Sequence, residues 1–214
     1  MYLNIEQDYK EKIDAIWAKQ IERHPETREC DIVRLGYAIE RQLKQNDVLF
    51  LGMNPSYKEG EWNNGGAGFY DIIAGNPYFQ TLISFSKETI GVEQISHHDM
   101  LYIRHTNQKE VINFFDDYKY KDFILEQILL SRDIICAAEP KLIVVLNAGV
   151  REIIKNLFSI DLNNDFDDEL GAYIIDIGKR VPVIFTGMLS GQRALDLGSK
   201  RTLQWQIQRL LRNY

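Results

Sequence analysis

Two turns in the sequence carry side chains that could act on a bound ligand. They end the segments VLFLGMNPSYKEG, over 48–60, and PVIFTGMLSGQR, over 182–193. Each segment is a short apolar run that stops in small and polar residues, which is typical of a buried parallel strand. Ligands of open α/β sheets bind at the carboxyl ends of such strands, so we expect both turns to contribute to one site. Asn54 in the first turn could orient a water molecule there, although an amide cannot remove its proton.

The elements that would position these turns alternate along the chain. Spacing of apolar residues and capping residues predict helices over 5–24, 31–42, 76–86, 120–138, 148–157 and 199–212, the last of them capped by Ser199. Apolar runs predict strands over 48–53, 99–106, 141–147, 172–177 and 181–185. This alternation indicates an α/β fold, a three-layer α/β/α sandwich with a mainly parallel central sheet. We expect one domain over 1–214, with 1–45 as an N-terminal helical segment packed on it.

Composition and charge limit the classes of function. With 214 residues, 45% hydrophobic and 26% charged, the chain is typical of a globular protein. The net charge of −6 argues against a broad nucleic-acid-binding surface, although basic residues near 179–180, 193 and 200–201 could form a local rim. No apolar segment approaches the roughly 20 residues of a membrane helix, and the N-terminus lacks an apolar signal core. We therefore expect a cytoplasmic monomer that does not contact a membrane.

The sequence carries no clear sign of a metal or an organic cofactor, and we expect neither. Cys30 and Cys136 cannot form a four-thiolate site. His97 and His98 are adjacent, so their side chains would point in different directions, and no third ligand stands at a recognised spacing. Nucleotide-binding glycine motifs and the GxSxG motif of serine hydrolases are also missing.

Four short motifs occur in an order that resembles the uracil-DNA glycosylase superfamily. GMNPS resembles its first motif, LYIRHTN its middle strand, KLIVVLNAG a core strand with its turn, and LSGQR its second motif. The similarity spans about 47–193. It implies a uracil-DNA glycosylase-like fold with DNA as partner, and it implies that Asn54 is the catalytic residue that positions the attacking water.

The resemblance also implies roles for other side chains around a flipped-out base. Base-binding residues would be Met53, Phe69, Tyr70, Arg104 and His105. Contacts to DNA would come from Ser56, Leu189, Ser190, Gln192 and Arg193, with the leucine filling the space that the base leaves. For Phe69 and Tyr70, packing of the loop on the core is an equally good interpretation. A strand presents only one of Arg104 and His105 on a given face, and His105 could equally be a hydrogen-bonded histidine at a strand end.

The sequence departs from this family at two places. Many members have a histidine after the last core strand that stabilises the leaving base, whereas this chain has Phe185, Thr186 and Gly187. The uracil-specific asparagine is replaced around Arg104 and His105. We therefore expect a divergent DNA glycosylase that removes a deaminated or damaged base. Two alternatives stay open: a non-catalytic protein that binds a nucleotide, nucleic acid or protein, and a hydrolase of free nucleosides or nucleotides.

Overall fold

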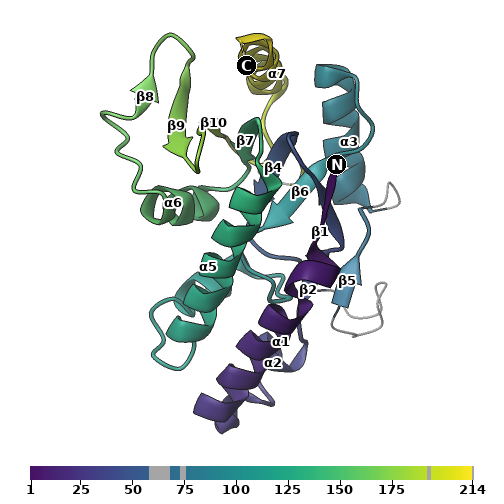
Figure 1. Ribbon diagram of the computed structural model, residues 1–214. Helices are drawn as coiled ribbons and strands as arrows, with labels where there is room; N and C mark the ends of the chain where they lie inside the picture. The colour runs from purple at the N-terminus through teal and green to yellow at the C-terminus, as the bar shows by residue number, and fades with distance from the viewer. Residues whose placement is uncertain (58–67, 73–75, 192–193, 214) are drawn as a thin grey trace.

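The computed structural model describes residues 1–57, 68–72, 76–191 and 194–213 (Figure 1). In chain order its elements are β1 (Tyr2–Asn4), α1 (Ile5–Arg23), the 3-10 helix η1 (Pro25–Thr27), α2 (Asp31–Arg34), β2 (Ala38–Glu40), β3 (Gln42–Lys44), β4 (Val48–Gly52), β5 (Gly68–Tyr70), α3 (Pro77–Ile90), β6 (Ser96–Asp99), α4 (Gln108–Asn113), α5 (Lys121–Ala138), β7 (Leu142–Val145), α6 (Ala148–Leu157), β8 (Phe166–Asp167), β9 (Ala172–Asp176), β10 (Arg180–Phe185) and α7 (Leu197–Asn213).

The central sheet contains six strands in the order β6-β4-β7-β10-β9-β8. β6, β4, β7 and β10 are parallel, whereas β9 and β8 form an antiparallel edge. Two small sheets, β1-β3 and β2-β5, accompany it. The prediction of a mainly parallel central sheet is therefore confirmed.

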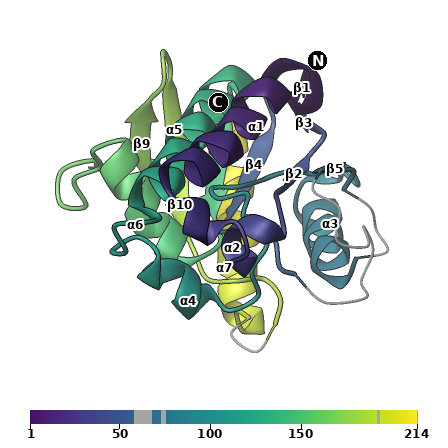
Figure 2. The ribbon, with the colours of Figure 1, turned by 90° about the horizontal axis from the view of Figure 1, so that it is seen from below.

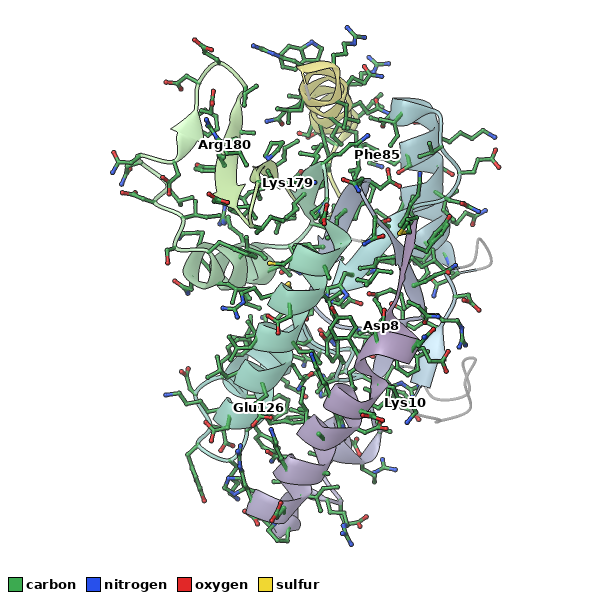
Figure 3. All side chains as sticks on the ribbon, viewed as in Figure 1. Asp8, Lys10, Phe85, Glu126, Lys179 and Arg180 are labelled. Atoms are coloured by element: carbon green, nitrogen blue, oxygen red, sulfur yellow. The ribbon has the colours of Figure 1, made fainter. Side chains whose placement is uncertain are left out.

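Alternate side chains of the parallel strands enter two separate apolar cores. Leu49 and Leu51 of β4 pack with residues of α1, α5 and α6, whereas Val48 and Phe50 pack with α3 and α7. Figures 1 and 2 show α1 and α5 side by side over one face of the sheet. On the other face, Phe85 of α3, labelled in Figure 3, packs edge-on against Phe50 with ring centroids 6.3 Å apart. Helices thus cover both faces, as the three-layer prediction requires.

Capping residues explain where several helices begin and end. The Asn4 side chain accepts a hydrogen bond from the backbone N–H of Gln7 at 3.1 Å and starts α1. Asn76 caps α3 in the same way, and Pro77 occupies its first turn, as the sequence predicts. Gly91 ends α3 with a φ of 74°, a left-handed conformation that glycine adopts without strain.

Three sequence-based predictions are wrong in detail. The helix predicted over 31–42 ends at Arg34, because the chain turns at Gly36, with a φ of 67°, into β2 and β3. The strand predicted over 99–106 is instead β6, which ends at Asp99, and the following residues keep only a bridge between Ile103 and Tyr37. The last helix is capped by Asp196, because its Oδ1 accepts from the backbone N–H of Ser199 at 3.0 Å.

Within the part of the chain that the structure describes, no helix combines the length and the apolar character that a membrane span requires.

Candidate active site

The candidate active site lies at the carboxyl ends of β4 and β7, near the middle of the sheet. The chain leaves β4 toward β6 on one side, whereas it leaves β7 toward β10 on the other side. Loops that diverge in this way leave a crevice, which is the usual ligand site of open α/β sheets. A cavity of about 740 Å³ occupies this position, walled in part by residues 52–56, 146–147 and 188–191. Its size is that of a small-molecule pocket.

Asn54 enters this cavity with its side chain held in one orientation. Its Nδ2 faces three backbone carbonyl oxygens, those of His105 at 2.7 Å, Pro55 at 3.0 Å and Ile103 at 3.3 Å. Because all three are acceptors, the amide nitrogen must point toward them. The Oδ1 atom is buried and accepts no hydrogen bond from the described residues. An unsatisfied buried acceptor costs about 1–3 kcal/mol, so a donor that reached this atom would be bound favourably.

Asp99 also lines the cavity, at the end of β6. Its backbone is in register with Gly52 of β4, and a Cβ atom at position 52 would lie only 2.1 Å from the Asp99 Oδ1 atom. The Asp99 residue is 7% exposed. Burial raises the pKa of its carboxyl well above the usual value, and the nearby carboxyl of Glu40 raises it further. These effects favour the neutral carboxylic acid, which can both donate and accept a hydrogen bond.

His97 supports Asp99 from the same face of β6. Its Nε2 lies 3.1 Å from the hydroxyl oxygen of Tyr78 and 3.8 Å from Oδ1 of Asp99. Burial, and to a lesser degree His98, lowers the pKa of His97 to about 3. The imidazole is therefore neutral and cannot stabilise a negative charge on Asp99 as an ion pair would.

His98 points to the opposite face of β6, as expected for adjacent residues of a strand. Its Nδ1 lies 2.5 Å from Oε1 of Glu40, and its Nε2 lies 3.1 Å from Oγ of Ser131. A serine, a histidine and a carboxylate are thereby linked as in a serine hydrolase. However, all three residues are at most 1% exposed and none lines the cavity, so a substrate cannot reach the serine.

The structure brings together most of the side chains that the resemblance singled out. Those that line the cavity are Met53, Asn54, Ser56, Tyr70, Arg104, Leu189 and Ser190. Phe69 and His105 do not line it. Gln192 and Arg193 lie outside the described residues.

Arg104, and not His105, occupies the cavity wall. Arg104 is 4% exposed, donates to the carbonyl oxygen of Leu35 at 3.3 Å, and places its guanidinium 4.9 Å from the ring centroid of Tyr57. Burial lowers its pKa. The Nε2 of His105 instead lies 3.2 Å from a carboxylate oxygen of Glu110. The contribution of His105 to the site is its backbone carbonyl, which holds Asn54.

The two aromatic residues of β5 have different roles. Phe69 packs edge-on against Tyr37, with ring centroids 5.8 Å apart. This contact agrees with the interpretation that Phe69 packs on the core. Tyr70 is buried, lines the cavity and lies against Phe79 at the same centroid distance of 5.8 Å. Tyr70 and Phe79 therefore give the cavity an aromatic wall.

Leu189 is 2% exposed and packs with the core under α3 and α7. Its side chain does not protrude from the molecule in this conformation. A role as a wedge in duplex DNA would require the loop after β10 to move.

Comparisons with models of protein families and with curated proteins find no match for this chain. The resemblance to the uracil-DNA glycosylase superfamily therefore rests on the order of its motifs.

Sequence reasoning missed Asp99 and Asn147 as site residues. Asn147 caps α6 by accepting from the backbone N–H of Gly149 at 2.7 Å, and it donates to Oε1 of Gln108 at 2.9 Å at the cavity wall. The signal that could have revealed Asp99 is Gly52, since a glycine within a buried strand often marks the close approach of another group. Among the residues that the structure describes, no three His, Cys, Asp or Glu side chains are grouped so that they could hold a metal ion.

Proposed function

We propose that this protein is a divergent DNA base-excision glycosylase that hydrolyses the N-glycosidic bond of a deaminated or damaged base. The observation that carries the proposal is that one cavity is lined both by Asn54, whose amide is held in one orientation, and by Asp99, whose carboxyl pKa burial raises well above its usual value. The motif order of the uracil-DNA glycosylase superfamily supports the same chemistry. DNA would be the partner, and the protein would act as a cytoplasmic monomer.

In this reaction the bond between the base nitrogen and C1′ of the sugar breaks, and its electron pair leaves with the base. The sugar becomes an oxocarbenium-like cation, which a water oxygen attacks at C1′ while the water loses a proton to solvent. Such a cation is a strong electrophile, so the water needs orientation more than deprotonation. Asn54 Oδ1 would accept a hydrogen bond from this water and hold it in place, which requires the wall that buries this atom to open toward the cavity.

The departing base needs stabilisation of its developing negative charge. Asp99, as a neutral acid, would donate a hydrogen bond to an oxygen or nitrogen atom of the base. Tyr70 and Phe79 would stack on the base, and Arg104 would face its edge or a phosphate. The reaction consumes only water, so it requires neither a metal nor an organic cofactor.

The test is strand cleavage by alkali after incubation with single- and double-stranded oligonucleotides that contain uracil, hypoxanthine, xanthine or a mispaired thymine. Native protein should produce abasic sites on at least one substrate, and Asn54→Ala should not. An Asn4→Ala variant, which changes an asparagine far from the cavity, serves as the control. Equal cleavage by the native protein and Asn54→Ala would contradict the proposed role of Asn54.

A second candidate is a non-catalytic protein of the same fold that binds a nucleotide, nucleic acid or protein partner. The observation that favours it is the lack of any basic atom on Asn54, together with the burial of Leu189. Binding that depends on Asn54 and Asp99, without cleavage of any oligonucleotide, would support this second candidate.

A further inference from the structure

α7 differs from the rest of the chain in its charge. It contains Lys200, Arg201, Arg209 and Arg212 and no acidic residue, within a chain whose net charge is −6. None of these four cations forms an ion pair with the described residues, whereas many other basic side chains are paired. Arg209 donates to the backbone carbonyl oxygen of Glu169 at 2.6 Å, and this neutral acceptor leaves its positive charge uncompensated.

The exposed residues of α7 form one face. Arg201, Trp205 and Arg209 follow one another at four-residue spacing, Arg212 comes three residues later, and all four are exposed. A rise of 1.5 Å per residue gives this row a length of about 16 Å. Trp205 is 56% exposed, and the guanidinium of Arg209 lies 5.3 Å from its ring centroid. Figures 1 and 3 show α7 at the edge of the molecule, with one side turned away from the sheet.

α7 follows directly on a segment that is bonded to the cavity wall. Leu195 donates its backbone N–H to the carbonyl oxygen of Met188, which lines the cavity, at 2.9 Å. Asp196 then caps α7. The start of α7 at Leu197, four residues before Arg201, is thereby held near the loop after β10, which lines the candidate active site.

We infer that the outer face of α7, formed by Arg201, Trp205, Arg209 and Arg212, binds the phosphate backbone of a nucleic-acid strand whose target base enters the cavity. A row of cations with an exposed aromatic ring matches a regularly spaced polyanion that also offers bases for stacking. A membrane surface fits less well, because the apolar face of α7 is buried in the core through Leu203, Ile207 and Leu210. The inference rests on the proposed function for the class of its ligand.

The experiment measures binding of an undamaged, fluorescently labelled 30-nucleotide oligonucleotide at several salt concentrations. The α7 variant carries Arg201→Gln, Arg209→Gln and Arg212→Gln. Its matched control carries the same change in charge on α1 and α5, through Lys12→Gln, Lys121→Gln and Arg132→Gln, which are also exposed. Thermal melting shows that both variants are folded.

The α7 variant should bind about tenfold or more weakly at low salt, and the slope of log Kd against log salt concentration should fall by about 2. The control variant should differ little from native protein. Binding should also quench tryptophan fluorescence, and Trp205→Phe should remove most of that quenching. The inference would be overturned if both triple variants lost the same amount of binding affinity or if the native protein did not bind the oligonucleotide at all. It would also be overturned if the native protein bound anionic vesicles in preference to the oligonucleotide.

These outcomes are separable from those of the proposed function, because binding of undamaged DNA involves no base release. If the protein releases no base but its binding depends on α7, the proposed glycosylase activity is rejected and the proposed binding role of α7 is supported. If the protein releases a base but its binding does not depend on α7, only the proposed binding role of α7 is rejected.

Discussion

The carboxyl group of Asp99 lies over Gly52, in the space that a side chain at position 52 would occupy. β4 and β6 are parallel neighbours with these two residues in register, so the contact is fixed by the sheet itself. The absence of a Cβ atom on Gly52 lets the carboxyl group of Asp99 turn inward at the cavity wall, where burial raises its pKa well above the usual value. The proposed chemistry depends on this arrangement.

Gly52→Ala should therefore disturb both the fold and the site. The new methyl group would lie 2.1 Å from Oδ1 of Asp99 and 2.9 Å from Nε2 of His97. Overpacking of this kind typically costs about 1–3 kcal/mol of unfolding free energy. Urea denaturation of Gly52→Ala, Asp99→Ala and the double variant measures the coupling. If the clash is with Asp99, Gly52→Ala should lower the unfolding free energy clearly less in the Asp99→Ala background than in native protein. An equal loss of unfolding free energy in both backgrounds would contradict a clash with Asp99.

Replacing Asp99 by asparagine tests which protonation state is active. An amide resembles a neutral carboxyl group because it has one donor and one acceptor. Asp99→Asn should therefore keep base release within about tenfold of native protein, whereas Asp99→Ala should lose roughly 100-fold or more. Native activity should fall as the pH rises through the raised pKa of Asp99, and Asp99→Asn should lack this decline. A large loss in Asp99→Asn at every pH would show that the carboxylate is the active form.

The same carboxyl group should make folding stability depend on pH. Because its pKa is higher in the folded state than in the unfolded state, the folded protein binds more protons between these two values. Stability contributed by Asp99 is then lost as the pH rises above about 4 toward the raised pKa. Asp99→Asn should be more stable than native protein at neutral pH, and the difference should shrink near pH 4. Melting temperatures across pH 4–8 measure this, and a constant difference would argue against a raised pKa.

Asn54→Asp should not improve the enzyme, although it introduces a possible base. Three carbonyl oxygens face the amide nitrogen, and a carboxylate oxygen in its place would be repelled by each of them. We expect a loss of about 1–3 kcal/mol of unfolding free energy at neutral pH, with part of it recovered at acid pH as the group becomes protonated. Asn54→Ala removes the same donor without adding charge and is the matched control. A variant more active and as stable as native protein would contradict the assigned amide orientation.

Leu189→Ala should act mainly on stability. Leu189 is buried, and truncation of a buried leucine typically costs about 2–5 kcal/mol. Leu189→Met keeps the volume and should cost much less. If Leu189→Ala instead leaves the unfolding free energy unchanged and impairs only double-stranded substrates, the leucine acts as a wedge in the duplex.

The sequence predicts correctly those helices and strands whose local sequence pattern matches the way they pack in the fold. Asn76 and Pro77 mark the start of α3, and the apolar run over 141–147 contains β7, because both patterns need no knowledge of distant residues. β6 is different, since its residues Ser-His-His-Asp are polar. Partners from other elements bind them in the interior: Lys44 binds Ser96, Tyr78 binds Nε2 of His97, and Glu40 binds His98. No local pattern reports such partners, so the sequence pattern places the start of this strand at Asp99 and not at Ser96.

The same reason explains the outcome at the candidate site. Asn54 stands in a recognisable turn after an apolar strand, and its placement in the cavity follows from the sheet. The predicted strand over 99–106 places Asp99 at its first residue, whereas Asp99 is the last residue of β6 and therefore lies at the carboxyl end of the sheet. Arg104 and His105 lie after β6 and not on a strand. Only the tertiary structure shows that Arg104 lines the cavity and that His105 lies outside the lining, paired with Glu110.

In the proposed reaction, Asn54 and Asp99 together release a base from DNA. Its most direct test is mass spectrometry of the free base released from the single- and double-stranded oligonucleotides by native protein, Asp99→Asn, Asp99→Ala and Asn54→Ala. We expect one deaminated or damaged base to be released by native protein and Asp99→Asn, with release lost in the two alanine variants. No free base from any substrate, while the oligonucleotides still bind in the cavity, would contradict the claim and favour a non-catalytic binding protein.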